Sequence, residues 1–102
     1  MANENQQNPV VFVERIDDER GNLVPDGGTT DSKVLKLTGR APATTPANTE
    51  VEVYADFNRI AMFKTQGGGY FSGSFNVQPG RHKFYVHIQM VGNSHAYLVY
   101  VT

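Results

Sequence analysis

The chain has 102 residues, enough for one packed domain and too few for a catalytic domain joined to a separate substrate domain. Nine Lys and Arg against ten Asp and Glu give a net charge of -1, without the strongly basic character of nucleic-acid-binding proteins. No stretch approaches the roughly 20 apolar residues that insert into a membrane, and the absence of Cys excludes disulfides and thiolate chemistry.

The charge is unevenly placed along the chain. All ten acidic residues lie between Glu4 and Asp56, so residues 1–56 carry a net charge of -5 and residues 57–102 carry +4. The densest acidic segment begins at Asp17, and clustered carboxylates in a loop either repel one another or share a cation.

The N-terminal part divides into a tail and a first strand. Residues 1–9 are polar and lack the plan of a signal peptide, so we predict a tail before a single domain of residues 10–102. Residues 10–16 are rich in Val and Ile, and we expect them to form a strand at a sheet edge. Residues 21–28 contain Gly, Pro and Asn and are predicted as an ordered loop.

Six further segments show the alternation of apolar and polar residues that predicts half-buried strands. They cover residues 33–39, 50–55, 60–65, 70–77, 81–90 and 95–102. We expect Leu35 and Leu37 to lie on one face of their strand, and Phe84, Val86 and Ile88 to lie on one face of theirs. Seven short strands without crossover helices predict an all-β fold, an antiparallel sandwich of two sheets, with a small barrel as the alternative.

Three kinds of connection separate these strands. Residues 41–49 contain two Pro and are predicted as a loop, because Pro cannot donate to a central ladder. Residues 56–59 offer turn residues and predict a hairpin between the strands that flank them. The triple glycine, residues 67–69, is predicted as a hairpin turn, since no helix follows it to bind a phosphate.

Several short motifs occur in a characteristic order. They are Asp17-Asp18, Gly27-Gly28-Thr29-Thr30-Asp31, Leu37-Thr38-Gly39, Val51-Glu52-Val53-Tyr54, Gly69 with Phe71 and Phe75, and Gly80-Arg81-His82. In order and spacing the chain resembles one repeat of the bacterial immunoglobulin-like domains strung along large exported adhesins and biofilm proteins. It departs from that pattern at Ser32, where a second Asp is usual, and in having no Trp.

The resemblance implies an immunoglobulin-like sandwich of about seven antiparallel strands in two sheets. It also implies a non-enzymatic spacer or adhesive unit of a bacterial surface or exported protein, with similar domains or a surface ligand as partners. Calcium would stiffen the domain junctions, with Asp17, Asp18 and Asp31 as ligands and Asp26 as an addition. Because calcium takes six to eight oxygens, carbonyls, water or a neighbouring domain would complete the shell. A solvated acidic loop is the alternative.

Eleven aromatic residues suggest a second function, a self-contained module that binds a carbohydrate or a protein. By alternation we predict that five of them point outward as a ligand-binding surface: Tyr54, Phe57, Tyr70, Tyr85 and Tyr97. Cross-strand aromatic pairs on a sheet face are the alternative interpretation.

The sequence offers little for catalysis. His82 and His87 lie five residues apart on one strand, so we expect them on opposite faces rather than in a metal site. None of the serines lies in a Gly-x-Ser-x-Gly elbow, and no acid-base pair is apparent. We therefore expect that the chain is not an enzyme.

Overall fold

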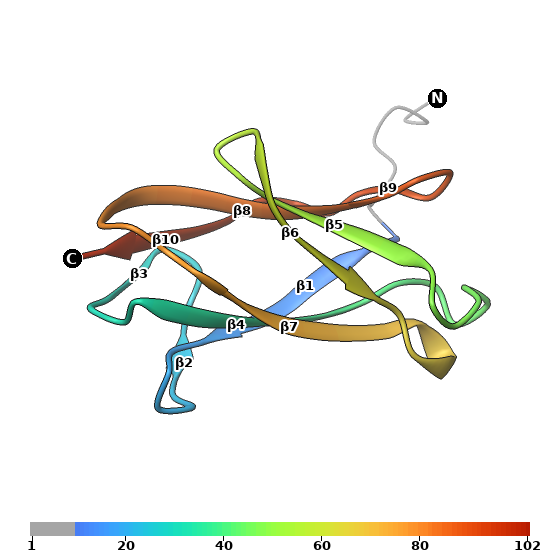
Figure 1. Cartoon of the computed structure of the whole chain (residues 1–102), viewed down its shortest axis with the longest axis horizontal. Helices are drawn as coiled ribbons and strands as arrows, with labels where there is room; N and C mark the ends of the chain where they lie inside the picture. Colours follow the sequence, from blue (N-terminus) through green and yellow to red (C-terminus); the bar gives the residue numbers. More distant parts are fainter. Residues whose placement is uncertain (1–9) are drawn as a thin grey trace, which may run out of the picture.

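Alternating apolar residues build two β-sheets that pack face to face (Figure 1). The computed structural model describes residues 10–102, and the predicted tail at residues 1–9 lies outside the described residues. The elements are β1 (Phe12–Asp17), β2 (Leu23–Val24), β3 (Gly28–Thr30), β4 (Val34–Arg40), β5 (Glu50–Ala55), β6 (Asn58–Lys64), the short 3-10 helix η2 (Gly67–Gly69), β7 (Tyr70–Asn76), β8 (Gly80–Ile88), β9 (Gly92–Asn93) and β10 (Tyr97–Val101). Within this range no helix has the length and apolar character needed to cross a bilayer.

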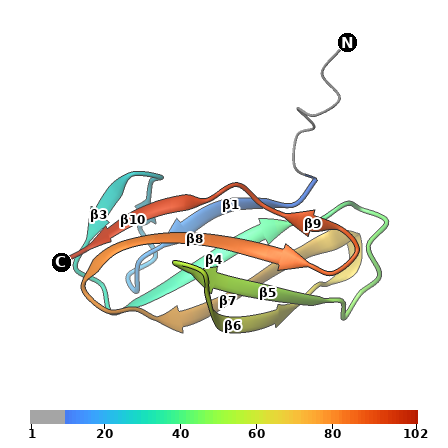
Figure 2. The same cartoon turned by 90° about the horizontal axis from the view of Figure 1, so that it is seen from above.

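The strand order confirms the predicted all-β sandwich. The first sheet has the order β2-β1-β4-β7, and the second has the order β3-β10-β8-β5-β6, with β9 added beside β8. In Figure 1 β8 and β10 lie above β1 and β4, and Figure 2 gives the view from above. Two separate layers with mostly antiparallel pairing form a β-sandwich rather than the small barrel.

The core lies between the two layers and follows the predicted alternation. Leu35 and Leu37 of β4 have no exposed surface, and neither do Phe84, Val86 and Ile88 of β8. These side chains belong to a single hydrophobic cluster that also includes buried residues of β1, β5, β7 and β10. Burial of this apolar surface is the main force that holds the layers together.

Two expectations about the edges of the sheets are wrong. The segment from residue 21 to 28, predicted as a loop, contains β2 and the start of β3. Because β2 pairs with β1, the first strand lies between β2 and β4 rather than at an edge. β3 pairs with β10 in parallel, the one exception to antiparallel pairing among the strands of residues 10–102. Pieces of two or three residues are too short to show an alternating pattern, which is why the sequence did not reveal them.

A close approach of side chain to backbone joins the edge strands of the two layers. Phe63 of β6 is buried, and its ring lies where a Cβ atom on Gly73 of β7 would be. Glycine is therefore required at position 73 by packing against Phe63.

We predict that Gly73→Ala lowers the free energy of unfolding by about 1–3 kcal/mol, because the new methyl group overlaps the Phe63 ring. Urea unfolding of both proteins measures the difference. The matched control is Gly67→Ala, where an added Cβ meets open space, and it should change stability much less. Equal effects of the two substitutions would contradict this packing argument.

Candidate functional site

Two tyrosines stack at the centre of the outer surface of the second sheet. Tyr54 of β5 lies opposite Tyr85 of β8 in the strand register. Their ring centroids are 5.1 Å apart and the ring planes differ by 5°. Since their neighbours Val53 and Val86 are fully buried, the tyrosines point away from the core. Both are partly exposed, as cross-strand partners on the outside of a sheet.

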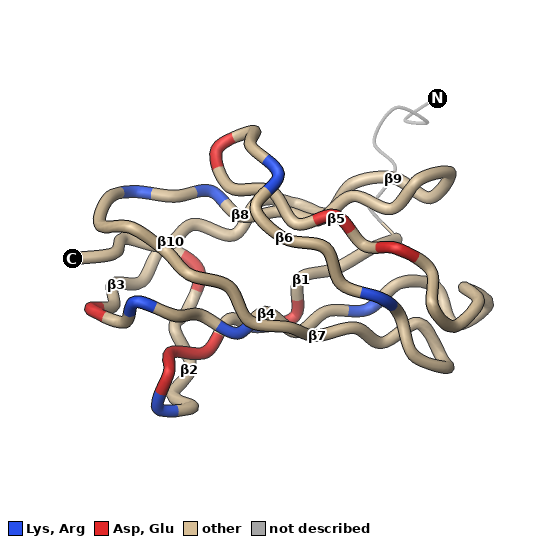
Figure 3. The backbone as a smooth tube through the Cα atoms, in the orientation of Figure 1, with Lys and Arg blue, Asp and Glu red and all other residues tan. Residues whose placement is uncertain are grey.

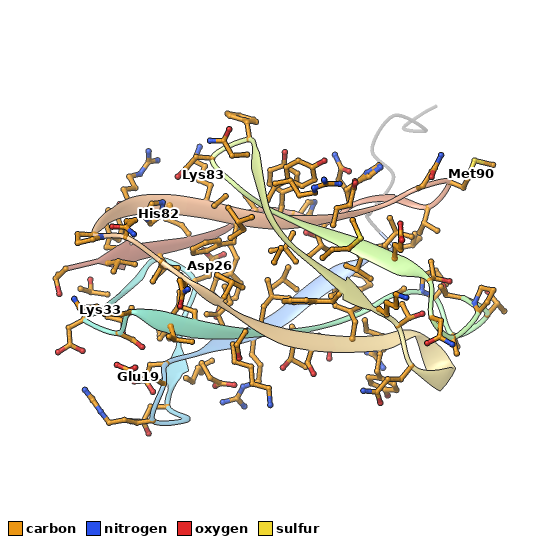
Figure 4. All side chains as sticks on the ribbon, viewed as in Figure 1. Glu19, Asp26, Lys33, His82, Lys83 and Met90 are labelled. Carbon is orange, nitrogen blue, oxygen red and sulfur yellow. The ribbon has the colours of Figure 1, made fainter. Side chains whose placement is uncertain are left out.

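Three hollows follow one another along this surface and share residues. The first is lined by Asp56, Phe57, Lys83, Tyr85 and Ala96. The second is lined by Tyr54, Tyr85, His87 and Asn93. The third is lined by Thr49, Glu50, Glu52, His87, Gln89 and Met90. We name this surface the β5–β8 face and define it by Tyr54, Phe57, Lys83, Tyr85, His87 and Met90. Figure 4 places Lys83 and Met90 toward its opposite ends.

Phe57 is displayed at the tip of the β5–β6 hairpin. The turn has two central residues, Asp56 with φ 52° and Phe57 with φ 74°, and positive φ at both is the requirement of a type I′ turn. Asp tolerates this conformation, but a bulky aromatic residue rarely adopts it. The Phe57 side chain is nevertheless 84% exposed, and the hairpin stands clear of the sheet in Figure 1. The chain thus holds an apolar ring in water on a strained backbone.

Asp56 fastens this turn to β8 through both backbone and side chain. Its N–H donates to the Lys83 carbonyl at 3.0 Å, and its Oδ1 accepts the Lys83 N–H at 3.0 Å. Its Oδ2 lies 2.7 Å from Nδ1 of His82. Burial raises the pKa of the Asp56 carboxyl, but the hydrogen bonds from Lys83 and His82, together with the charges of His82 and Arg81, bring the pKa below its usual value. These contacts fix the position of Phe57 beside Tyr85.

Met90 lies at the other end of the β5–β8 face and, like Phe57, is an exposed apolar residue with positive φ. It lies in the turn between β8 and β9, its φ is 70°, and its side chain is 97% exposed. Phe57 and Met90 are the two most exposed large apolar side chains among residues 10–102. They are also the two residues in this range that are neither Gly, Asn nor Asp and have positive φ. Both ends of the face therefore combine backbone strain with apolar exposure.

The contact between Asp56 and His82 is an acid-base pair that the sequence analysis missed. A catalytic His would need its second ring nitrogen free to exchange a proton with a substrate. Nε2 of His82 instead lies 2.8 Å from the carbonyl oxygen of Gln78. Both ring nitrogens thus face hydrogen-bond acceptors within the protein, which is the arrangement of a structural histidine.

Polar contacts hold the tyrosine pair in place. The Tyr54 hydroxyl donates to Oε1 of Glu52 at 3.3 Å, and Arg59 donates to Oε2 of the same carboxylate at 3.1 Å. Burial, followed by the Glu52 charge, raises the pKa of the Tyr54 phenol. On β8, Nδ1 of His87 lies 2.5 Å from Oδ1 of Asn93, on the opposite side of the strand from His82, as predicted.

Two of the five predicted surface aromatics lie elsewhere. Tyr97 is a core residue that is only 9% exposed, and its hydroxyl donates to the Val24 carbonyl at 2.6 Å. The prediction that it points outward is wrong, because Tyr97 has the same parity on β10 as the buried Val99. Tyr70 is exposed but lies on β7 in the other sheet, with the Arg40 guanidinium 5.6 Å from its ring centroid. Tyr54, Phe57 and Tyr85 alone come together on one face.

The four predicted calcium ligands each contact donors within the protein. Asp17 pairs with Arg15, and Asp31 pairs with Arg20 at 3.5 Å. Asp18 accepts the backbone N–H groups of Asn22 and Arg20, and the Asn22 bond is the main reason that its pKa is lowered. Asp26 accepts the Leu98 N–H at 2.8 Å. Residues 10–102 hold no group of three or more His, Asp or Glu arranged for a metal, and calcium binding stays a prediction.

Ser32 has a structural role at the position where the resembled repeats carry a second Asp. Its hydroxyl is buried, accepts the Glu19 N–H at 3.0 Å and donates to the Val34 carbonyl at 2.6 Å. It thereby ties the β1–β2 turn to the start of β4, a contact that a longer charged side chain would not make in the same way.

The sequence analysis did not assign the other residues of the face to a ligand-binding surface. Lys83 and His87 share the parity of Tyr85 on β8, and this alternation was the available signal. Met90 was assigned to the end of a strand, whereas β8 ends at Ile88. Positive φ at a Phe or Met has no sequence signature, because neither residue favours that conformation.

Comparison with known proteins adds no relative. No protein-family model matches the chain, and no curated protein or solved structure matches it significantly. The resemblance to adhesin repeats therefore rests on the sequence motifs alone.

The first prediction for this site concerns pH. Because the folded-state pKa of Asp56 is lowered, its contribution to stability is present above about pH 4 and is lost as the pH falls through the folded-state value. Asp56→Asn should therefore reduce the free energy of unfolding at pH 7, and the difference from the unmodified protein should shrink at pH 2–3. Urea unfolding across this range measures it.

The control for the Asp56 experiment is Asp31→Asn. Asp31 makes a single long ion pair on an exposed surface, and such pairs contribute little to stability. A difference for Asp56→Asn that is the same at every pH would contradict the role assigned to its carboxylate.

The second prediction concerns the strain at Phe57. Phe57→Gly should leave the melting temperature unchanged or raise it, because relief of about 1–2 kcal/mol of left-handed strain opposes a smaller loss of chain entropy. The matched control is Tyr100→Gly, an exposed aromatic in the extended strand β10, which should lower the melting temperature. If both variants destabilise the protein equally, Phe57 is not strained.

Proposed function

We propose that the chain is a non-enzymatic immunoglobulin-like module that acts by contact with another protein through the β5–β8 face. The observation that carries this proposal is Phe57, whose exposed ring is held on a backbone with strained, positive φ. The setting in a bacterial surface or exported protein, as an adhesive unit, comes from the sequence resemblance.

The energetics of Phe57 favour a contact surface. A Gly or Asn would form the same turn without strain, so the needs of the fold do not explain an aromatic ring at this position. Burial of a Phe side chain contributes about 1.5–3 kcal/mol relative to exposure, and Phe57 obtains little of it within the chain because it is 84% exposed. A partner that covers the ring would supply that free energy.

Rigidity supports the same interpretation. The Asp56 contacts with Lys83 and His82 hold the turn before any partner arrives, so little further ordering is needed on binding. Pre-organised aromatic anchors beside a hollow are typical of the residues that dominate protein interfaces. Lys83, at the rim of the same hollow, adds charge that a protein partner can match.

The hollow beside Phe57 favours a protein ligand over a carbohydrate. The walls of the hollow beside Phe57 are mainly apolar, which suits an apolar side chain of a partner.

We predict that a photoreactive amino acid at position 57 forms covalent adducts with a protein when the full-length chain is illuminated in the cells that produce it. The matched control places the same group at Leu23, which is 52% exposed on the other sheet and should give far fewer adducts. The distribution of adducts is read by mass spectrometry. An absence of protein adducts at position 57, or equal yields at both positions, would contradict the proposed function.

A further inference from the structure

The two sheets end in four strands, β2 and β7 in the first sheet and β3 and β6 in the second. β2 has two residues and β3 has three, and such short edge strands offer little to pair with. β6 has a shift in its register with β5 and carries Arg59 and Lys64, features that discourage pairing with another chain. β7 has seven residues in unbroken register with β4 and contains neither a charge nor a Pro, and Figure 3 shows it in tan along its length. Of these four edges of the described chain, β7 alone has no protection against pairing.

The hydrogen bonds around β7 show which of its groups face the open edge. Just beyond the two ends of the β4–β7 ladder, Val77 N–H donates to the Lys33 carbonyl and Ala41 N–H donates to the Gly69 carbonyl. Hydrogen-bonded pairs alternate along an antiparallel ladder, so the odd-numbered residues of β7 bond to β4 and the even-numbered residues direct their N–H and C=O groups away from it. The residues whose outward groups have no backbone partner within residues 10–102 are Ser72, Ser74 and Asn76.

Contact with the second sheet leaves this edge open. β6 meets β7 from the core side, where the Phe63 ring lies against Gly73. The two strands belong to different sheets and form no ladder with each other. In Figure 1 β7 runs across the front of the molecule, ahead of β4.

The sequence of β7 reads the same in both directions about Gly73. From Phe71 to Phe75 it is Phe-Ser-Gly-Ser-Phe. We propose that β7 pairs antiparallel with β7 of a second copy of this chain, about a two-fold axis that passes beside Gly73 perpendicular to the sheet. Ser72 of each copy then lies opposite Ser74 of the other, and the two four-stranded sheets join into one continuous sheet.

The backbone groups of β7 fit this register. Ser72 and Ser74 of the second copy both direct N–H and C=O groups at each other, so each of the two serine pairs forms two hydrogen bonds. Gly73 lies opposite Gly73 of the second copy in a non-hydrogen-bonded pair, because its own groups bond to β4. A slip of one residue would place outward groups opposite inward ones and remove these bonds. The same axis gives the longest overlap, all seven residues of each strand.

The side chains of β7 also suit a second copy. On the outer surface serine meets serine, and on the core side Phe71 meets Phe75 of the second copy, both of them favourable cross-strand pairs. The nearest cations are Lys36 and Arg40 on β4. In the dimer the two β4 strands are three strand spacings apart, about 14 Å, which exceeds the screening length of about 8 Å at physiological salt. An uncharged edge cannot select a partner by charge, whereas its palindromic sequence is complementary to itself.

The length of β7 sets the expected strength of the contact. Seven residues at about 3.4 Å each give a contact about 24 Å long and one strand deep. Such a contact buries less than the roughly 800 Å² per partner of a standard interface, so we expect a weak dimer.

Sedimentation equilibrium of the full chain from micromolar to millimolar concentration tests the inference. We expect a reversible equilibrium that ends at the dimer, because a two-fold contact uses the same edge on both copies. Ser74→Pro should weaken association about tenfold or more, since it removes an N–H that bonds across the interface and places a ring there. The β4–β7 ladder keeps its bonds in this variant, because the Ser74 N–H does not bond to β4.

The matched control is Met62→Pro on β6, the edge strand of the other sheet. Thr65 N–H donates to the Thr49 carbonyl, so by the same alternation the Met62 N–H points away from β5. This variant loses an equivalent outward N–H and should leave association unchanged. Thermal melts of both variants establish that they are folded.

Disulfide formation tests the register without Pro. The chain has no Cys of its own. An equimolar mixture of the Ser72→Cys and Ser74→Cys proteins places the two Cys directly opposite, about 5.5 Å apart between Cα atoms, a separation that a disulfide spans. In either variant alone the two Cys are diagonal neighbours roughly 7–8 Å apart, too far for a disulfide. We therefore expect linked dimers to form at least tenfold faster in the mixture, as measured on non-reducing gels.

The outcomes decide this inference separately from the proposed function. A chain that stays monomeric at millimolar concentration, oligomers that grow beyond the dimer, or equal disulfide rates in the mixture and in the single variants would each overturn it. Equal association of the Ser74→Pro and Met62→Pro proteins would do the same. The β5–β8 face lies on the second sheet and stays free in this dimer, so adducts at position 57 test the proposed function whichever result is obtained.

Discussion

The pairing of β5 with β8 is the contact on which both the core and the candidate site depend. Tyr54 opposite Tyr85 places Val53, Ala55, Phe84 and Val86 in the core and sends the alternate side chains outward. A slip of one residue would bury the charged residues of these strands and expose the apolar ones. The hydrophobic effect therefore selects one register, and that register assembles the outer face as a consequence.

Local strain and tertiary contact act against each other at the β5–β6 hairpin. A Phe residue in the left-handed region costs about 1–2 kcal/mol, and its exposed ring recovers little of this cost. The Asp56 contacts with β8 keep the turn in place in spite of that strain. Positions where a fold maintains such a conformation are often those that meet a ligand, and here the strained residue borders an apolar hollow.

Charges of opposite sign are separated along the sequence but lie close together in the fold. Along the sequence the acidic residues precede the basic ones, which suggests a chain with one acidic half and one basic half. Pairing of β5 with β8 brings the last acidic residues of the first half beside basic residues of the second, on a single sheet face. The strand register therefore places opposite charges from the two halves side by side, because Glu50 lies opposite Lys64 and Glu52 contacts Arg59.

The sequence by itself determined the fold class and the identity of the core, because alternation of Leu35 and Leu37, or of Phe84 and Val86, reports directly which face is buried. Because Tyr97 lies two residues from the buried Val99 on β10, the same alternation would also have placed Tyr97 inside. Only the tertiary structure decided which surface residues meet. It placed Phe57 beside Tyr85 at one end of a face and Met90 at the other end, put Tyr70 on the other sheet, and gave each candidate calcium ligand a partner within the protein. The physical reason is that burial depends on a local period of two residues, whereas a surface site depends on register, turn conformation and contacts between residues distant in the chain.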